Sequence, residues 1–167
     1  MSVDDIKASA EAARNAIDAA RTAAMGAMSE AQNLAQDAAA RGWEGVARTV
    51  MAAQSSLEAV ASSLGSAHDA ADGATNGAGE ITNQMSPPDI ATHAGSVMGQ
   101  LDQATTAIDS ANGSVGEAYN YAQQVEADRL FAIVASVVDS LGTARQITGA
   151  AKTTAATEQQ EAQSWGK

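Results

Sequence analysis

The sequence predicts an all-α protein in which long antiparallel, alanine-rich helices form helical hairpins and an elongated four-helix bundle. Small and apolar residues recur at alternating spacings of three and four over most of the chain, the pattern of a heptad seam. Clusters of Gly or Pro interrupt this pattern at only a few places. We expect a single elongated domain over residues 1–167, with a hairpin at 1–82, a linker at 83–88 and helices at 89–167.

The composition limits how such helices can be stabilised. The chain has 41 alanines among 167 residues, but only one Phe, two Tyr and two Trp. Each buried CH₂ contributes roughly 0.8 kcal/mol, so alanine seams need great length or close helix approach. Either the helices pack very closely within one chain, or a second molecule completes the seams. We expect the second, a homo-oligomer.

The charge distribution excludes two classes of partner. The net charge is −11, and no Lys or Arg occurs between Arg48 and Arg129. Such a chain is unsuited to nucleic acid and to an anionic membrane, because both repel negative charge. The acidic surface is either a solvated face or a docking surface for a basic partner, and the first is the simpler interpretation.

The sequence gives limited information about the compartment. There is no cysteine, which excludes a disulfide framework and thiolate chemistry. No stretch approaches the ~20 consecutive apolar residues of a membrane span. The acidic start, with Asp4 and Asp5, lacks the basic and apolar regions of a conventional signal peptide.

The first predicted helix has an uninterrupted seam from Val3 to Ala38. Ser2 is expected to cap it, with Asp5 in the capping-box position. Alanine fills most of this seam, and its large members after Val3 are Ile6, Ile17 and Leu34. Small side chains allow a partner helix to approach closely.

A hairpin corner is expected at Arg41–Gly45, where the sequence reads Arg-Gly-Trp-Glu-Gly. Gly42 suits a helix C-cap, because a left-handed backbone costs glycine nothing, and Gly45 gives the chain freedom to turn back. Trp43 is expected to place its large apolar face where the two helices meet. We therefore take Gly42, Trp43, Glu44 and Gly45 as the turn motif.

The second seam runs from Val46 to Ile81, but its far end is rich in glycine. Because each helical glycine costs about 1 kcal/mol relative to alanine, a weak or interrupted helix is expected at residues 72–80. The clearest break follows at residues 83–88. There Ser86 is expected to act as an N-cap, with Pro87 in the first turn and Asp89 at its end.

The third seam runs from Ile90 to Val125, and Asn112-Gly113 within it could form a tight turn. The last segment either follows a turn near Glu126–Asp128 or continues the third helix as one long rod. No Gly or Pro occurs between Glu117 and Leu141, which keeps the rod possible.

The most hydrophobic stretch of the chain lies at 130–141, with apolar residues both on the seam and beside it. Such a helix is expected to be covered on more than one side. We predict an oligomer contact made by Leu130, Phe131, Val134 and Val138.

No motif predicts catalysis. The two histidines, His68 and His93, are far apart and form no i,i+4 ligand pair, so we interpret them as surface residues rather than metal ligands. The chain has no G-x-S-x-G elbow and no glycine loop with the Lys of a phosphate site. We expect no catalytic residue, no metal and no cofactor.

Trp43-Glu44-Gly45 between two long amphipathic helices resembles the WXG100 family of helical-hairpin proteins exported by type VII (ESX) secretion systems. The resemblance covers roughly residues 1–82. It implies a secreted, non-enzymatic helical protein that pairs with itself or with a related partner. The chain departs from the family by being about twice as long as its short members. It also lacks their Y-x-x-x-D/E export signal, since Gln123 follows Tyr119 and Val125 follows Tyr121 at that spacing.

The leading hypothesis is a non-catalytic helical interaction protein of this WXG100-like kind, secreted without a conventional signal peptide. The alternative is a self-assembling rod or filament subunit whose alanine seams pack between molecules. For the compartment, the alternative is the cytoplasm.

Overall fold

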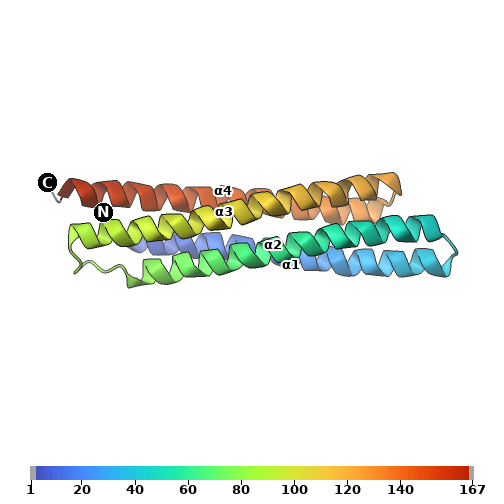
Figure 1. Cartoon of the computed structure of the whole chain (residues 1–167), viewed down its shortest axis with the longest axis horizontal. Coiled ribbons are helices and arrows are strands. Elements are labelled where there is room, and N and C mark those ends of the chain that lie inside the picture. Colours follow the sequence, from blue (N-terminus) through green and yellow to red (C-terminus); the bar gives the residue numbers. More distant parts are fainter. Residues whose placement is uncertain (1–2, 166–167) are drawn as a thin grey trace.

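The structure, a computed structural model, describes residues 3–165 and contains four long helices in that range (Figure 1). The helices are α1 (Val3–Ala40), α2 (Glu44–Glu80), α3 (Pro87–Gln124) and α4 (Asp128–Trp165). No strand occurs among these described residues. The predicted fold class, an all-α bundle of four long helices, is confirmed. The predicted cap Ser2 lies outside the described residues.

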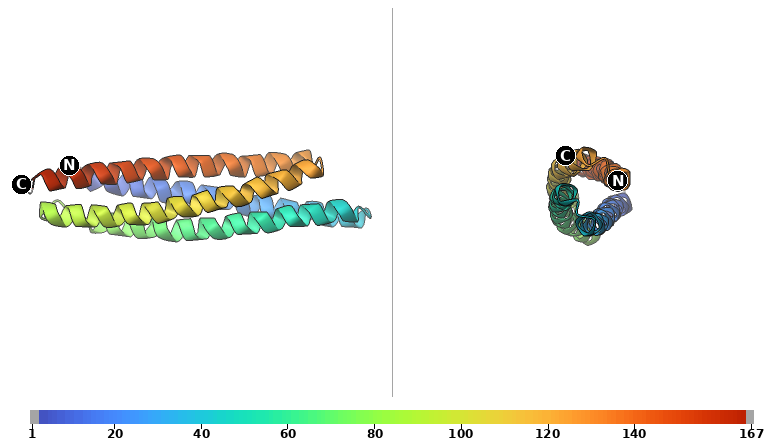
Figure 2. Two further views of the ribbon diagram at one scale, coloured as in Figure 1. Left: turned by 45° about the horizontal axis from the view of Figure 1, so that its top comes forward. Right: turned by 90° about the vertical axis from the view of Figure 1, so that its right-hand side faces the viewer.

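The helices run alternately up and down the long axis. Each packs against the next in sequence, and α4 returns to pack against α1. Figures 1 and 2 place the α1–α2 and α3–α4 turns at one end of the bundle, which we call the two-turn end. The α2–α3 linker and both chain termini lie at the opposite end, which we call the terminal end. Four helices of 37 or 38 residues match in length, so all four span the bundle.

The predicted seams form the core along nearly their whole length. On α1 the seam residues from Val3 to Ala31 are buried, most of them completely. Near the two-turn end the pattern shifts by one residue. Ala35 is buried instead of Leu34, and Ala47 instead of Val46. The smaller residue faces the core at both positions, and the larger one lies at its edge.

Two predicted interruptions are absent. Helix α2 continues through residues 72–80, and α3 continues through Asn112-Gly113. Seam residues on either side of both sites are buried, and this tertiary packing outweighs the low helix propensity of glycine. At Gly77 a Cβ would lie 3.5 Å from a Val97 methyl group, so the glycine-rich part of α2 packs close to α3.

The predicted N-cap of the third helix is confirmed, but the linker spans residues 81–86 rather than 83–88, because α2 ends at Glu80 and α3 begins at Pro87. Ser86 is the N-cap of α3, and its Oγ accepts a hydrogen bond from the Asp89 backbone N–H at 3.4 Å. The same hydroxyl donates to the Asp89 carboxylate at 2.6 Å. Pro87 occupies the first helical position, where its missing N–H costs nothing.

The rod alternative is wrong, because the chain reverses between Gln124 and Asp128. The turn contains no glycine, and Glu126 takes the left-handed conformation with φ 49°. Such a φ is unfavourable for a residue with a Cβ, so tertiary packing of α3 against α4 holds it there.

The core divides into two clusters along the bundle axis. The turn-end cluster includes Ile17, Leu57, Leu64, Ile108 and Leu141 among its large side chains. The terminal-end cluster takes its large side chains from Val3, Ile6, Ile81, Ile90, Val97 and Leu101. Alanines of all four helices fill the space between these large residues in both clusters.

Candidate interaction site at the two-turn end

The two-turn end contains a pocket that two distant parts of the chain build together. Its volume is about 300 Å³. The first hairpin contributes Leu34, Asp37, Ala38, Arg41, Trp43, Val46 and Val50, and the α3–α4 turn contributes Val125, Glu126 and Ala127. Leu34 and Val50 therefore lie at the same pocket, as expected if the chain folds back at the predicted corner.

A glycine cap at the end of α1 positions the first wall of this pocket. Gly42 has φ 74°, the left-handed conformation that suits glycine. Its N–H donates to the Ala39 carbonyl at 3.0 Å, and the Trp43 N–H donates to the Ala38 carbonyl at 2.9 Å. These two bonds make a Schellman motif, which satisfies the last carbonyls of α1. The predicted C-cap role of Gly42 is confirmed.

Trp43 is more exposed than predicted. It lies outside the helices, as the N-cap residue of α2, and 54% of its surface is accessible. The Arg41 guanidinium carbon lies 5.3 Å from the centroid of its ring, a cation–π contact. The expectation that Trp43 is covered where the two helices meet is wrong. The Schellman motif turns the chain so tightly that the ring stands at the pocket's rim.

The other two residues of the motif begin α2. Glu44 is the acidic residue of its first turn, where the helix dipole favours negative charge. Gly45 follows, and its carbonyl accepts a hydrogen bond from the Thr49 hydroxyl at 3.1 Å. Both are exposed, and neither lines the pocket. Gly42 therefore makes the turn that presents Trp43 to the pocket, whereas Glu44 and Gly45 belong to the first turn of α2. The expectation that Gly45 gives the chain freedom to turn back is wrong, because its backbone is helical.

The pocket combines an apolar surface with charged groups. Leu34, Val46, Val50 and Val125 supply aliphatic surface. Around them, Asp37 and Glu126 provide negative charge and Arg41 positive charge. These lining residues include no hydroxyl, thiol or imidazole group. An apolar side chain flanked by a basic group would suit this surface.

The residues predicted to contact another molecule divide into two pairs. Leu130 and Val134 are fully buried in the turn-end cluster, so the structure assigns them to the core of the chain rather than to an intermolecular contact. Phe131 is half-buried and its ring lies 4.6 Å from that of Tyr119, centroid to centroid. Val138 is 38% exposed. Only Phe131 and Val138 offer accessible surface.

Helix α4 is unusually apolar for its degree of burial. It is the one described helix that contains an 18-residue window apolar enough to cross a membrane, by length and composition alone. Only 28% of that window is buried. A two-in-seven seam buries about that share, and the other large apolar residues are either half-buried at the edge of the core, as Phe131 and Ile133 are, or exposed, as Val138 is. The sequence does not show this window as a continuous apolar stretch, because Asp139 and Arg145 interrupt it.

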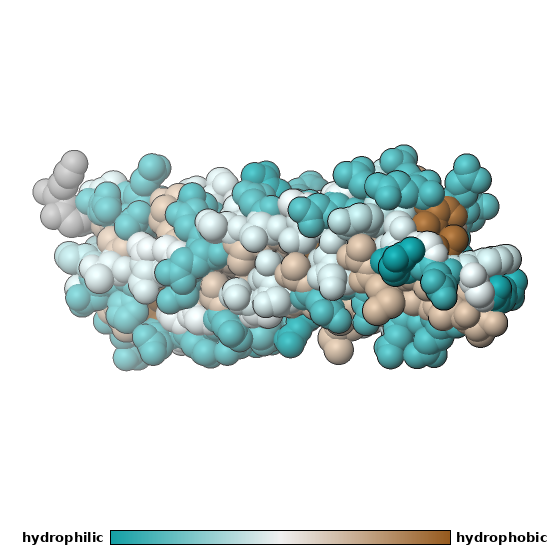
Figure 3. Space-filling view, turned by 45° about the vertical axis from the view of Figure 1, so that its right-hand side comes forward, coloured by the Kyte–Doolittle hydropathy of each residue, from teal (hydrophilic) through white to brown (hydrophobic). Residues whose placement is uncertain are grey.

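Apolar surface is also visible at the two-turn end. In the view of Figure 3, which brings that end forward, brown and tan groups gather there between hydrophilic ones. Beside the α3–α4 turn, Phe131 lines a shallow depression of about 500 Å³ together with Glu126, Ala127 and Asp128. Another, of about 620 Å³, lies between Val138 and Tyr119. The apolar surface thus continues from the Trp43 pocket toward the exposed side of α4.

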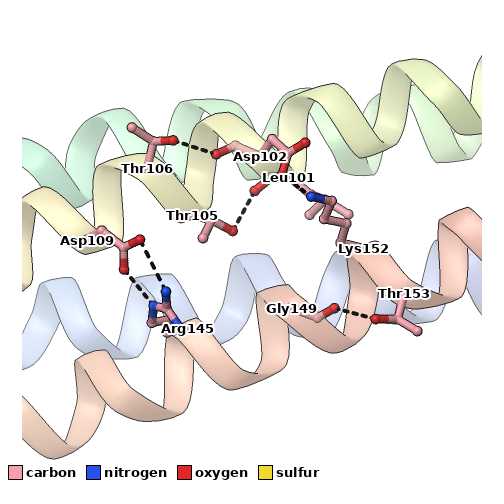
Figure 4. Close-up of polar contacts among 9 residues, drawn as sticks. All are labelled: Leu101, Asp102, Thr105, Thr106, Asp109, Arg145, Gly149, Lys152 and Thr153. Carbon is pink, nitrogen blue, oxygen red and sulfur yellow. Dashed lines mark hydrogen bonds and ion pairs between the residues drawn. The ribbon is translucent and has the colours of Figure 1, made fainter.

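Ion pairs on the surface join neighbouring helices of the bundle. Asp109 and Asp102 of α3 pair with Arg145 and Lys152 of α4, as Figure 4 shows. Glu30 of α1 pairs with Arg129 of α4 at 2.6 Å. The two pairs with α3 join basic residues of the last segment to the acidic middle of the chain.

The histidines lie on the surface of the bundle. His68 Nδ1 is 2.7 Å from the Asp18 carboxylate, and His93 Nδ1 is 3.7 Å from that of Glu80. Within residues 3–165, no three His, Asp or Glu side chains are grouped so that they could hold a metal ion. Each histidine bridges two neighbouring helices.

Comparison with protein-family models, with curated proteins and with solved structures finds no match to this chain.

Proposed function

We propose that this protein is a non-catalytic helical interaction protein, resembling the WXG100-type secreted proteins, that works through helix–helix association. The observation that carries the proposal is Trp43, which stands exposed at the rim of an apolar pocket with Arg41 against its ring. Exposed tryptophan beside a concave apolar surface is typical of a protein contact, because Trp and Arg dominate the energy of such contacts.

The favoured partner is a second copy or a related helical protein. Helix α4 supports this, since Phe131 and Val138 add accessible apolar surface beyond what its own bundle covers. Accessible large apolar side chains on one helix favour a protein contact over a solvated face. The net charge of −11 makes nucleic acid and anionic membrane unsuitable partners.

The oligomer is tested by light scattering after size exclusion. We expect a discrete dimer, about twice the 16.8 kDa of the chain. Val138→Glu is expected to convert it to monomer, because it introduces a charge into the proposed contact. Ser136→Glu is the matched control, since Ser136 is also exposed on α4 and faces a different direction. A concentration-independent mass near 16.8 kDa for the unmodified chain would refute the oligomer.

A second candidate function is a filament subunit. It is favoured by the exposed tryptophans at opposite ends of the bundle, Trp43 at the two-turn end and Trp165, 70% accessible, at the terminal end. An end-to-end contact between unlike surfaces does not close on itself, so it produces open-ended growth. Mass increasing without limit with concentration, and lost in Trp165→Ala, would favour this function over the dimer.

The proposed WXG100-like role includes export from the cell; the cytoplasm is the alternative. Export is tested by expressing the chain in cells that carry a type VII secretion system and assaying the culture medium. Loss of the extracellular protein when the system is inactivated would support the role. Retention inside cells with an active system would contradict it.

A further inference from the structure

The second half of α4 contributes almost no large apolar side chain to the core. We call Thr148–Trp165 the strap. Its buried positions are Thr148, Ala151, Ala155, Glu158 and Ala162. The large side chains of the terminal-end cluster come instead from α1, from α3 and from Ile81 after α2. The strap therefore covers a groove whose large buried side chains all lie outside the strap, with Ile147 of α4, directly before the strap, packed against the same cluster.

The first half of α4 is anchored differently. It buries Leu130, Val134, Val137 and Leu141, each with several more methyl or methylene groups than an alanine. Since stabilisation grows with the apolar area removed from water, each anchor in the first half outweighs each alanine of the strap. The two halves of one continuous helix thus adhere to the bundle with very different strength.

Local features weaken the strap further at its start. Thr148 is fully buried, and its hydroxyl has no hydrogen-bond partner among the described residues. An unsatisfied buried hydroxyl opposes folding of the segment that carries it. Gly149 follows it and lowers helix propensity, so the helix is weakest where the strap begins.

Polar contacts hold the strap to α3. Lys152 Nζ lies 2.5 Å from an Asp102 carboxylate oxygen, and Gln159 Nε2 donates to the Ala91 carbonyl at 3.2 Å. The ion pair is roughly half exposed at both ends, so water and salt screen it. Such contacts fix the position of a docked segment but resist its release weakly.

We propose that the strap detaches as a unit, bending at Thr148-Gly149, while α1, α2, α3 and the first half of α4 remain folded. Opening uncovers the apolar groove that Ile6, Ile90 and Leu101 help to form. The bundle is then a three-helix body with a releasable fourth segment over its terminal end. Its opening is a local event, separate from the cooperative unfolding of the turn-end cluster.

Thiol labelling tests this, because the chain has no cysteine of its own. Ala155→Cys places a thiol under the strap, and Ala27→Cys places one in the turn-end cluster; both positions are fully buried. Without denaturant, the first should label at least tenfold faster, and its rate should depend less on urea, since a local opening exposes little surface. Ala150→Cys, at an exposed position, gives the intrinsic labelling rate. Equal rates at residues 155 and 27 would overturn the proposal.

Hydrogen exchange on the unmodified chain gives a second test that needs no substitution. Amides of residues 152–164 should exchange more than tenfold faster than those of residues 134–141, and with one common opening rate. Protection as strong in the strap as in the first half of α4 would overturn the proposal.

Discussion

The Arg145 guanidinium donates hydrogen bonds to both carboxylate oxygens of Asp109, from Nε to Oδ1 at 2.6 Å and from Nη2 to Oδ2 at 3.3 Å (Figure 4). This bidentate ion pair joins α3 to α4 just after Leu141, the last large buried residue in the first half of α4. The hydrogen bonds from Arg145 hold the pKa of the Asp109 carboxyl below its usual value, with the guanidinium charge adding to the effect.

The lowered pKa of Asp109 predicts how the pair responds to acid. The folded state binds this proton less readily than the unfolded state, so the pair stabilises the fold above the ordinary Asp pKa of about 3.9. That contribution is lost as pH falls through the lower folded pKa. Asp109→Asn should therefore lower the urea midpoint at pH 7, and the deficit should shrink from about pH 4 downward.

Asp139→Asn is the control for that measurement, because Asp139 is exposed on α4 and forms no ion pair within residues 3–165. It should leave the urea midpoint nearly unchanged at both pH values. A deficit in Asp109→Asn that is equally large at pH 7 and pH 3 would contradict an electrostatic role for the pair.

Thr148→Val should stabilise the protein by about 1 kcal/mol. The substitution keeps the shape of the side chain and removes a buried hydroxyl that has no partner among the described residues. Thr143→Val is the matched control, since Thr143 is exposed and its hydroxyl donates to the Asp139 carbonyl at 3.1 Å. Urea denaturation monitored by circular dichroism measures both. A loss of stability in Thr148→Val would indicate that a bound water satisfies the hydroxyl.

Two glycine substitutions should change the stability of the protein in opposite directions. Gly113→Ala lies inside α3 on an exposed face, and its new Cβ meets no atom within 4 Å. It should stabilise the protein by about 0.5–1 kcal/mol, because alanine loses less backbone entropy on folding. Gly42→Ala forces a Cβ onto φ 74° and should destabilise it by about 1–2 kcal/mol. Thermal melts compare them directly, and stabilisation by both would contradict the cap at Gly42.

Seam spacing made the helices and their buried faces predictable, since an alternation of three and four residues has few other structural meanings. Gly42 and Ser86 were also predictable, because cap chemistry is local. The Asn112-Gly113 turn was predicted wrongly, since a dipeptide signal says nothing about the seam packing that keeps α3 continuous. The turn at Glu126 could be predicted only as one of two alternatives, because no glycine or proline marks it.

The candidate site was less predictable than the fold. Its pocket joins the first hairpin to the α3–α4 turn, which are far apart in the sequence. The exchange of Leu34 for Ala35 in the core is a one-residue shift that the seam pattern does not encode. Burial of Trp43 was inferred from its large apolar face and its place at the hairpin corner, whereas the backbone geometry after Gly42 decides which way the ring faces.

Trp43→Ala separates a structural role from an interaction role. Truncating a buried tryptophan costs roughly 3–5 kcal/mol, but Trp43 is 54% exposed, so the isolated monomer should lose clearly less than that. Self-association should be strongly weakened, because the substitution removes the ring from the pocket rim. Urea denaturation at high dilution measures the first effect, and light scattering across a concentration series measures the second.

Met51→Ala is the matched control, since Met51 is exposed to a similar degree, 58%, on α2 and does not line the pocket. It should change neither the stability of the monomer nor the association. If Trp43→Ala associates as well as Met51→Ala does, the ring is no contact residue and the pocket has no part in the assembly. If instead Trp43→Ala loses 3 kcal/mol or more in the dilute monomer, the ring stabilises the hairpin, and the exposed face of α4 is left as the candidate contact.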